Sequence, residues 1–217
     1  MKENFRFYTE LLYFLLKNNH PSIPLIDISK KICMFDYPKH HTMATYYHKF
    51  EVRWSDIDAN RCLANAAYAD YCTQTRMGFM NKHKMGLSQL NRWGIAPVIL
   101  HEEVFFFQEI YTDQEVYVSL ELAGLSEDAG IYKFIHRFYL ADGSHCATVA
   151  VLGVWIDSMI RKMTSPPNDV LAAFSDYKTQ STEMLSRDTL KNSPTRPENI
   201  DPSVFLPKKW TKIQLRS

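Results

Sequence analysis

The chain has 217 residues, of which 46% are hydrophobic and 23% are charged, so it carries enough apolar side chain for the core of one typical domain. Its 25 basic and 24 acidic residues leave a formal net charge of +1, which excludes the broad positive surface of a nucleic-acid-binding protein. Any phosphate-binding site must therefore be local.

Residues 1–42 are predicted to form an N-terminal helical extension. Apolar residues recur at three- and four-residue steps from position 5 to 16, a spacing that suits one face of a helix. Thr9 and Glu10 interrupt this stretch, which is too short to span a bilayer and lacks a signal-peptide cleavage site. We expect a helix packed on the body of a soluble protein without a membrane partner. Alternatively, translation starts at Met43 and the extension is not native.

A strand and a long helix open the predicted body, which spans residues 43–175. Apolar and charged residues alternate over positions 50–54, a pattern typical of a strand. The segment 65–85 has no proline and is rich in Ala and Met, which favours a helix. Gly86 is well placed to end this helix, because glycine readily adopts the left-handed conformation found there.

Antiparallel strands are predicted after the helix. Apolar and polar residues alternate over 115–122, as in a strand with one buried face. The ranges 131–140 and 145–156 flank Asp142-Gly143, a dipeptide that favours a tight hairpin turn. Together these elements indicate an α+β domain in which one helix packs on an antiparallel sheet.

The end of the chain is predicted to carry little structure. A short helix is expected over 170–177, and Pro, Asn, Ser and charged residues accumulate around and beyond it. Residues 176–217 are therefore assigned to a poorly ordered C-terminal tail. The four cysteines are widely spaced without a C-x-x-C motif, so we expect neither a disulfide framework nor a metal site, and a cytoplasmic location.

The junction between the first strand and the helix holds two acids, Asp56 and Asp58. A carboxylate at this place lies beside the free backbone N–H groups of the first helical turn. One interpretation is that either acid simply caps the helix. The longer stretch WSDIDANRCLANAAYADYCTQTR, residues 54–76, favours a functional interpretation.

This stretch resembles the signature D-x-D-x-x-G-H-V-N-N-x-x-Y-x-x-x-x-E-x-x-R of the hotdog-fold acyl-CoA thioesterases, the 4-hydroxybenzoyl-CoA thioesterase-like family. The matching residues are Asp56, Asp58, Asn65, Tyr68 and Arg76. Similarity extends over roughly residues 46–172. The chain has Arg61-Cys62 in place of Gly-His, Ala64 in place of the first Asn, and Thr73 or Gln74 in place of the helix Glu that is catalytic in one branch.

The resemblance implies an α+β hotdog fold, in which an antiparallel sheet of five or six strands wraps around a long central helix. It also implies a homodimer or homotetramer with a site shared between chains. The aromatic run Phe105, Phe106 and Phe107 is compatible with such an interface, because both faces of that strand would then need cover. Alternatively, the three rings fill the core and edge of a single chain.

The resemblance also implies site residues. Asp58 would attack the thioester carbonyl or activate a water, while Asn65 and the backbone N–H groups of residues 63–65 would polarise that carbonyl. Asn60 matches a functional Asn of the plant acyl-carrier-protein thioesterases, and Asp56 is interpreted as structural support. Cys62 is interpreted as an inert thiol, the alternative being a reactive one at a helix start.

Three basic residues are candidates for the phosphates of coenzyme A: Arg161, Lys162 and Arg61. Coenzyme A is part of the substrate here, and no separate cofactor is expected. The predicted function is hydrolysis of an acyl-CoA thioester to the free acid and coenzyme A. The alternatives are hydrolysis of an acyl group carried on acyl carrier protein, and binding of an acyl ligand without catalysis.

Overall fold

A computed structural model of the protein describes residues 45–191 and 197–205, so the predicted extension over residues 1–42 lies outside the described residues. The elements in chain order are β1 (Tyr46–Glu51), η1 (Trp54–Asp56), α3 (Asn65–Lys82), α4 (Leu87–Trp93), β2 (Ile95–Phe106), β3 (Glu115–Ser126), β4 (Ile131–Leu140), β5 (His145–Asp157), α5 (Asn168–Ser175), β6 (Glu183–Leu185), α6 (Arg187–Lys191) and η2 (Pro202–Val204). Within these ranges, no helix is both long and apolar enough to cross a membrane.

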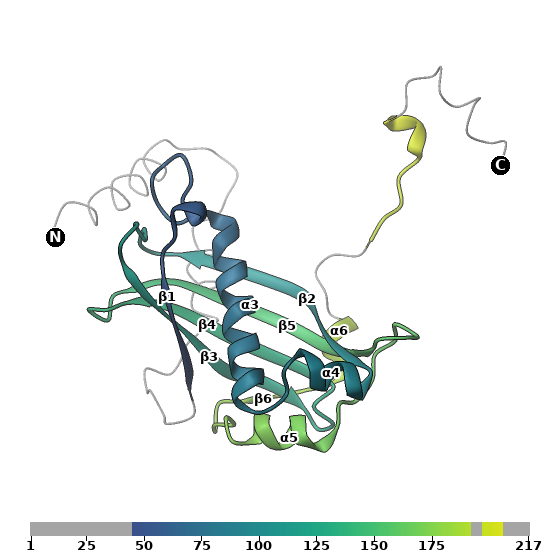
Figure 1. The fold of residues 1–217 in the computed structure, drawn as a ribbon. Coiled ribbons are helices and arrows are strands. Elements are labelled where there is room, and N and C mark those ends of the chain that lie inside the picture. The colour runs from purple at the N-terminus through teal and green to yellow at the C-terminus, as the bar shows by residue number, and fades with distance from the viewer. Residues whose placement is uncertain (1–44, 192–196, 206–217) are drawn as a thin grey trace, which may run out of the picture. The chain divides into compact units, whose positions relative to one another are not determined.

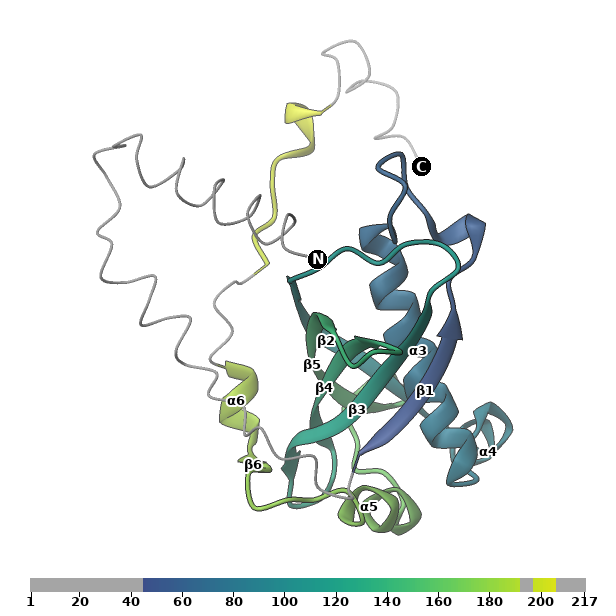
Figure 2. The same cartoon turned by 90° about the vertical axis from the view of Figure 1, so that its left-hand side faces the viewer.

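One sheet and one long helix form the body (Figures 1 and 2). The strands lie in the order β1-β3-β4-β5-β2 with antiparallel pairing, and β6 adds a short parallel pairing to β3. Helix α3 covers one face of this sheet, and we call the opposite face the outer face. The predicted fold class, an antiparallel sheet of five to six strands around a central helix, is confirmed.

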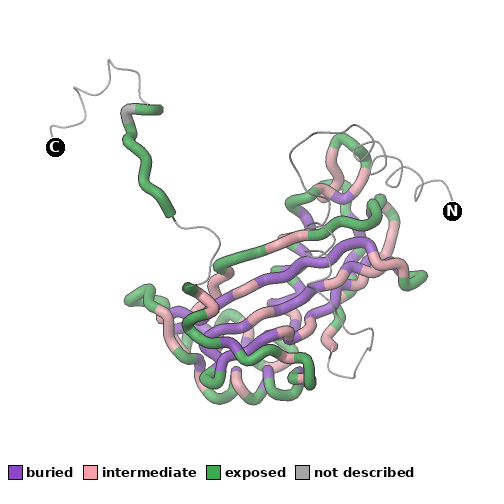
Figure 3. Tube along the Cα trace, turned by 180° about the vertical axis from the view of Figure 1, so that it is seen from behind, coloured by how far each residue is buried: buried purple, intermediate pink, exposed green. Residues whose placement is uncertain are grey.

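The core lies between α3 and the sheet. Tyr68, Cys72 and Phe79 recur along one side of the helix and are all buried, as their three- to four-residue spacing requires. Phe50 of β1 stacks on Tyr71 of α3 with ring centroids 4.3 Å apart, which ties the first strand to the helix. Along β3, β4 and β5 the buried positions run almost continuously (Figure 3), because both faces of the central strands are largely covered.

The end of α3 differs from the prediction. The helix stops at Lys82, and the residue in the left-handed conformation is Lys84, with φ 59°. Gly86 instead precedes α4 as its N-cap, with φ −65°. Glycine at position 86 is therefore not a helix stop.

The hairpin between β4 and β5 forms as predicted. Gly143 adopts φ 85°, and the Asp142 carboxylate accepts a hydrogen bond from the Ser144 N–H at 2.9 Å. After β5 and α5 (Asn168–Ser175), however, the chain does not become an irregular tail at residue 176. It forms β6 and α6 before residue 192, because Leu185 finds a buried position against the sheet.

Candidate functional site

Asp58 lies in a tight turn over residues 58–62 that precedes α3. The Asp58 N–H donates to the Cys62 carbonyl and the Arg61 N–H donates to the Asp58 carbonyl, both at 3.0 Å. The Asp58 carboxylate accepts the Asn60 N–H at 2.7 Å and the Asn60 side-chain amide at 3.2 Å. Asp58 is half-buried, so its carboxylate both holds the turn and remains open to solvent on one side.

Arg61 occupies the position where the thioesterase signature has Gly. It closes the turn with φ 66°, in the left-handed region that favours glycine. This backbone conformation gives the physical reason for Gly at that position of the signature. The Arg61 side chain itself is exposed to solvent.

Asp56 contacts groups that stabilise its charge. Its carboxylate accepts the Tyr71 hydroxyl at 2.9 Å and the Ser55 hydroxyl at 3.0 Å, and the Arg53 Nε lies 3.6 Å away. Burial and this hydrogen bond raise the pKa of Tyr71 well above its usual range. These contacts engage the Asp56 carboxylate within the protein, as expected for a residue that supports the structure.

The start of α3 supplies backbone donors, although not all of those predicted. The Leu63 N–H donates to the Ile110 carbonyl at 2.7 Å, and the Ala64 N–H donates to the Asp56 carbonyl at 2.8 Å. Neither group can therefore polarise a substrate. Ala64 is the N-cap and provides no side-chain acceptor, so the N–H groups of Asn65 and Ala66 in the first turn can bind an incoming oxygen.

Cys62 shares this turn. Its thiol lies 3.8 Å from the Asp58 carboxylate, in hydrogen-bonding position. Partial burial and the nearby negative charge of Asp58 raise the pKa of this thiol, the opposite of what a nucleophilic cysteine requires. The inert interpretation of Cys62 is therefore the better supported one.

Arg161 and Lys162 lie at the other end of the sheet. They follow β5 in a turn in which the Asp157 carboxylate accepts the N–H groups of Met159 and Ile160, and both basic side chains are exposed. The start of α3 instead lies beside Phe106, whose ring is 5.0 Å from that of Tyr68. Ten residues of β5 separate the two ends, on the order of 30 Å, so one chain does not bring these cations to Asp58.

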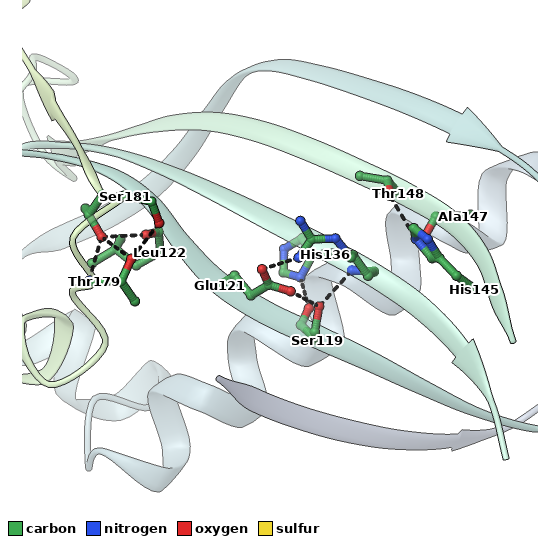
Figure 4. Close-up of polar contacts among 11 residues, drawn as sticks. Ser119, Glu121, Leu122, His136, His145, Ala147, Thr148, Thr179 and Ser181 are labelled. Carbon is green, nitrogen blue, oxygen red and sulfur yellow. Dashed lines mark hydrogen bonds and ion pairs between the residues drawn. The ribbon is translucent and has the colours of Figure 1, made fainter. Parts of the chain in front are cut away.

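A buried polar network that the sequence did not reveal lies farther along α3. Arg76, only 8% exposed, donates to Thr73 Oγ1 at 2.9 Å and lies 3.2 Å from His136 Nε2. His136 Nδ1 lies 2.8 Å from the Ser119 carbonyl (Figure 4). Since that carbonyl only accepts, Nδ1 carries the proton and Nε2 accepts from Arg76. Burial and the adjacent guanidinium lower the pKa of His136 to about 3, which keeps this imidazole neutral.

The network continues through the sheet to its outer face. The Arg137 N–H donates to the Ser119 hydroxyl at 2.8 Å, and that hydroxyl donates to Glu121 at 3.0 Å (Figure 4). Glu121 also pairs with the Arg137 side chain. The Arg137 N–H of β4 therefore binds the Ser119 hydroxyl and not the Ser119 carbonyl, which His136 occupies. Sequence reasoning could not find this network, because Arg76 and His136 are 60 residues apart and share no spacing signal.

The chemistry available at the start of α3 is that of a carboxylate beside backbone donors. Among the described residues, no group of three or more His, Cys, Asp or Glu side chains is arranged to hold a metal ion. Asp58, Asn60, Arg61 and the first residue of α3, Asn65, fall within a single loop and helix start. Arg161 and Lys162 are the predicted site residues that do not join them.

A protein-family model, described as the Thioesterase-like superfamily, matches residues 52–174. The chain belongs to this superfamily. The match contains the Asp58 turn, the helix α3 and the strands β2 to β5, and it ends within α5. No curated protein sequence gives a significant match.

Solved structures of the same fold include several thioesterases. A 1,4-dihydroxy-2-naphthoyl-CoA thioesterase from Synechocystis is 17% identical, with a TM-score of 0.56, covering 61% of this chain and 96% of that one. A Staphylococcus aureus protein in complex with CoA is 17% identical, with a TM-score of 0.58, covering 70% and 96%. A DHNA-CoA thioesterase from Staphylococcus aureus is 16% identical, with a TM-score of 0.56, covering 60% and 89%. At these identities the likeness establishes the hotdog fold of this superfamily member.

Proposed function

We propose that this superfamily member is an acyl-CoA thioesterase that hydrolyses an acyl-CoA thioester to the free acid and coenzyme A. The observation that carries the proposal is a half-buried carboxylate, Asp58, in the turn that leads into a helix start with free N–H donors. Membership of the superfamily supports the reaction class. The similar structures of two CoA thioesterases, and of a protein in complex with CoA, support the substrate class.

In the proposed reaction the thioester carbonyl oxygen binds the N–H groups of Asn65 and Ala66. Negative charge that develops on this oxygen is stabilised by these donors and by the helix dipole. Asp58 then takes a proton from a water that attacks the carbonyl carbon, or attacks that carbon itself to form an acyl anhydride, which a water afterwards hydrolyses to release the free acid and restore Asp58. The carbon–sulfur bond breaks, and coenzyme A leaves as a thiolate that takes up a proton. Asn60 holds the Asp58 carboxylate through both of its hydrogen bonds.

We further propose that the phosphates of coenzyme A are bound by Arg161 and Lys162 of a second copy of the chain, together with Arg61. Strand β2 is an edge strand of the sheet, and Pro97 within it is typical of an edge. Antiparallel pairing of β2 with its copy across a two-fold axis would place the start of one strand beside the end of the other. The basic turn after β5 would then approach the start of the other chain's α3.

Binding of an acyl ligand without catalysis is the second candidate function. Thr73 stands where one branch of the family carries a catalytic Glu, and its hydroxyl is engaged by Arg76 and the Ala69 carbonyl. Hydrolysis of an acyl group carried on acyl carrier protein is the third candidate function, and Asn60 is the residue that supports it. The same assay separates these functions if substrates carried on coenzyme A and on acyl carrier protein are compared.

The test is release of free thiol from a panel of acyl-CoA compounds, followed with a thiol-detecting reagent. Asp58→Asn keeps an oxygen that can accept the Asn60 N–H, so the turn should persist while kcat falls by roughly 10²–10⁴-fold. Asp70→Asn, an exposed acid on α3, is the matched control and should leave kcat unchanged. Full activity in Asp58→Asn contradicts the mechanism, and tight acyl-CoA binding without turnover in the wild type favours the binder.

The same assay tests whether the site is shared. Asp58→Asn and the double variant Arg161→Glu/Lys162→Glu are each expected to have low thioesterase activity when assayed alone. In a 1:1 mixture, subunit exchange makes half of all pairs mixed. Each mixed pair has one intact site out of two, so about a quarter of the wild-type activity should return. If all site residues came from one chain, mixing would restore nothing.

A further inference from the structure

A buried cation without an anionic partner lies in the middle of α3. The Arg76 side chain is 8% exposed, yet both groups that it contacts are uncharged: the Thr73 hydroxyl at 2.9 Å and the neutral His136 ring at 3.2 Å. Within the described part of the chain, no ion pair includes Arg76. A buried charge is costly unless an opposite charge compensates it. This guanidinium therefore lacks the anion that its burial calls for.

Glu102 of β2 does not supply that anion. Burial raises the pKa of the Cys72 thiol, which Arg76 lowers and Glu102 raises, so both charged side chains lie near this thiol. The Glu102 side chain is exposed, however, and it forms no ion pair with Arg76 among the described contacts. Two of the five N–H donors of the guanidinium are used by Thr73 and His136, which leaves three for a ligand.

Two more donors in the same part of the core have no acceptor. The Tyr132 hydroxyl and Trp155 Nε1 are buried without a hydrogen-bond partner among the described residues, although buried polar atoms are nearly always paired. Their rings lie 6.0 Å apart between centroids. Burial raises the pKa of Tyr132, and the nearby Arg76 guanidinium offsets part of that rise. Unused donors therefore gather around one buried positive charge.

One side of α3 leads from the candidate site to this charge. Asn65, Ala69 and Thr73 follow one another at four-residue steps, which places them on the same side of the helix. All three are small and at least partly exposed, and Thr73 is the residue that Arg76 contacts. Thr73 comes eight residues after Asn65, about 12 Å along the helix. A chain held by its carbonyl at the Asn65 N–H can follow this side to the guanidinium.

We propose that Arg76 and Tyr132 bind a carboxylate at the far end of the acyl group, so that the preferred substrates are ω-carboxyacyl-CoA thioesters. A carboxylate supplies the missing negative charge and accepts hydrogen bonds from both the guanidinium and the phenol. With carbon–carbon bonds of about 1.52 Å and angles of about 111°, an extended chain advances about 1.25 Å per carbon. The distance of about 12 Å therefore corresponds to an acyl group of about ten carbons.

The test compares thioesters of equal length that differ only at the far end. The mono-CoA thioester of decanedioic acid carries the terminal carboxylate, and decanoyl-CoA carries a methyl group in its place. Wild-type kcat/KM should favour the carboxylated thioester by at least about 10²-fold, because a methyl end leaves the buried polar groups unpaired. The difference should appear mainly in KM, since Arg76 is far from the reacting carbonyl.

Two variants assign the preference to its residues. Arg76→Gln keeps an amide donor for His136 but removes the charge, and it should reduce the preference to less than about tenfold. Tyr132→Phe removes a hydroxyl that has no partner in the described fold, so the fold should persist. This variant should lower kcat/KM for the carboxylated thioester roughly tenfold and leave decanoyl-CoA unchanged. Tyr117→Phe, whose hydroxyl donates to Glu115, is the matched control and should change neither substrate.

This inference rests on the proposed thioesterase function, and a binding measurement separates the two. Calorimetry on Asp58→Asn gives the Kd of both thioesters while turnover is slow. Tighter binding of the carboxylated thioester that is lost on adding Arg76→Gln would support the inference even if the wild type hydrolyses neither compound. Hydrolysis of both compounds with equal kcat/KM would overturn the inference and leave the thioesterase function standing. A preference that persists in Arg76→Gln and in Tyr132→Phe would show that other groups bind the carboxylate, and would also overturn it.

Discussion

Arg61→Gly is predicted to stabilise the protein. Arg61 closes the 58–62 turn with φ 66°, and its N–H is fixed on the Asp58 carbonyl at 3.0 Å, so the backbone cannot relax elsewhere. A left-handed conformation costs a residue with a Cβ about 1–2 kcal/mol. Glycine avoids this cost but gives the unfolded chain more freedom, worth about 0.5–1 kcal/mol. The free energy of unfolding should therefore rise by about 0.5–1 kcal/mol.

The assay is thermal and urea unfolding of three variants. For a chain of this length, about 1 kcal/mol shifts Tm by roughly 2–4 °C, so Arg61→Gly should raise Tm by about 1–4 °C. Arg61→Ala removes the charge but keeps the Cβ and should give no gain. Ala59→Gly, in the same turn but not at positive φ, should lower stability by about 0.4–1 kcal/mol. An equal gain in Arg61→Ala would show that the charge matters and the backbone does not.

Two further predictions concern titratable groups. The pKa of His136 is about 3 in the fold against 6.5 normally, so the unfolded chain binds the extra proton, and stability should fall by up to about 1.4 kcal/mol per unit as pH drops from 6.5 towards 3. His136→Gln, compared by urea unfolding across this range, should lose that component of the slope. Cys62, with its raised pKa, should react with iodoacetamide more slowly than free cysteine at pH 8, and Asp58→Asn should accelerate it. Fast alkylation in the wild type would refute the inert assignment.

Local patterns in the sequence were sufficient for the main elements. Alternation over 115–122 predicted the strand that the structure extends to Glu115–Ser126, and Asp142-Gly143 marked a hairpin that forms. These features depend on neighbours in the sequence, so a single chain reveals them. The stop of α3 was missed, because Lys84 adopts the left-handed conformation two residues before the glycine that the pattern favoured.

In the candidate site, too, local sequence predicted some features and missed others. The sequence placed Asp58, Asn60 and Asn65 together, because they lie within eight residues around one helix start. It could not show that the Leu63 and Ala64 N–H groups are already bound to Ile110 and Asp56, since one of these partners comes from a loop after β2. Such pairings depend on where distant segments lie.

By itself, the sequence predicted the fold class and the position of Asp58 just before the helix, because periodicity, turn residues and a short motif are local properties of the chain. Only the tertiary structure decided that Arg76 meets His136, that Arg161 and Lys162 lie far from Asp58, and that Leu185 covers the outer face. Each of these follows from how segments that are distant in the sequence pack against one another, which no local pattern specifies.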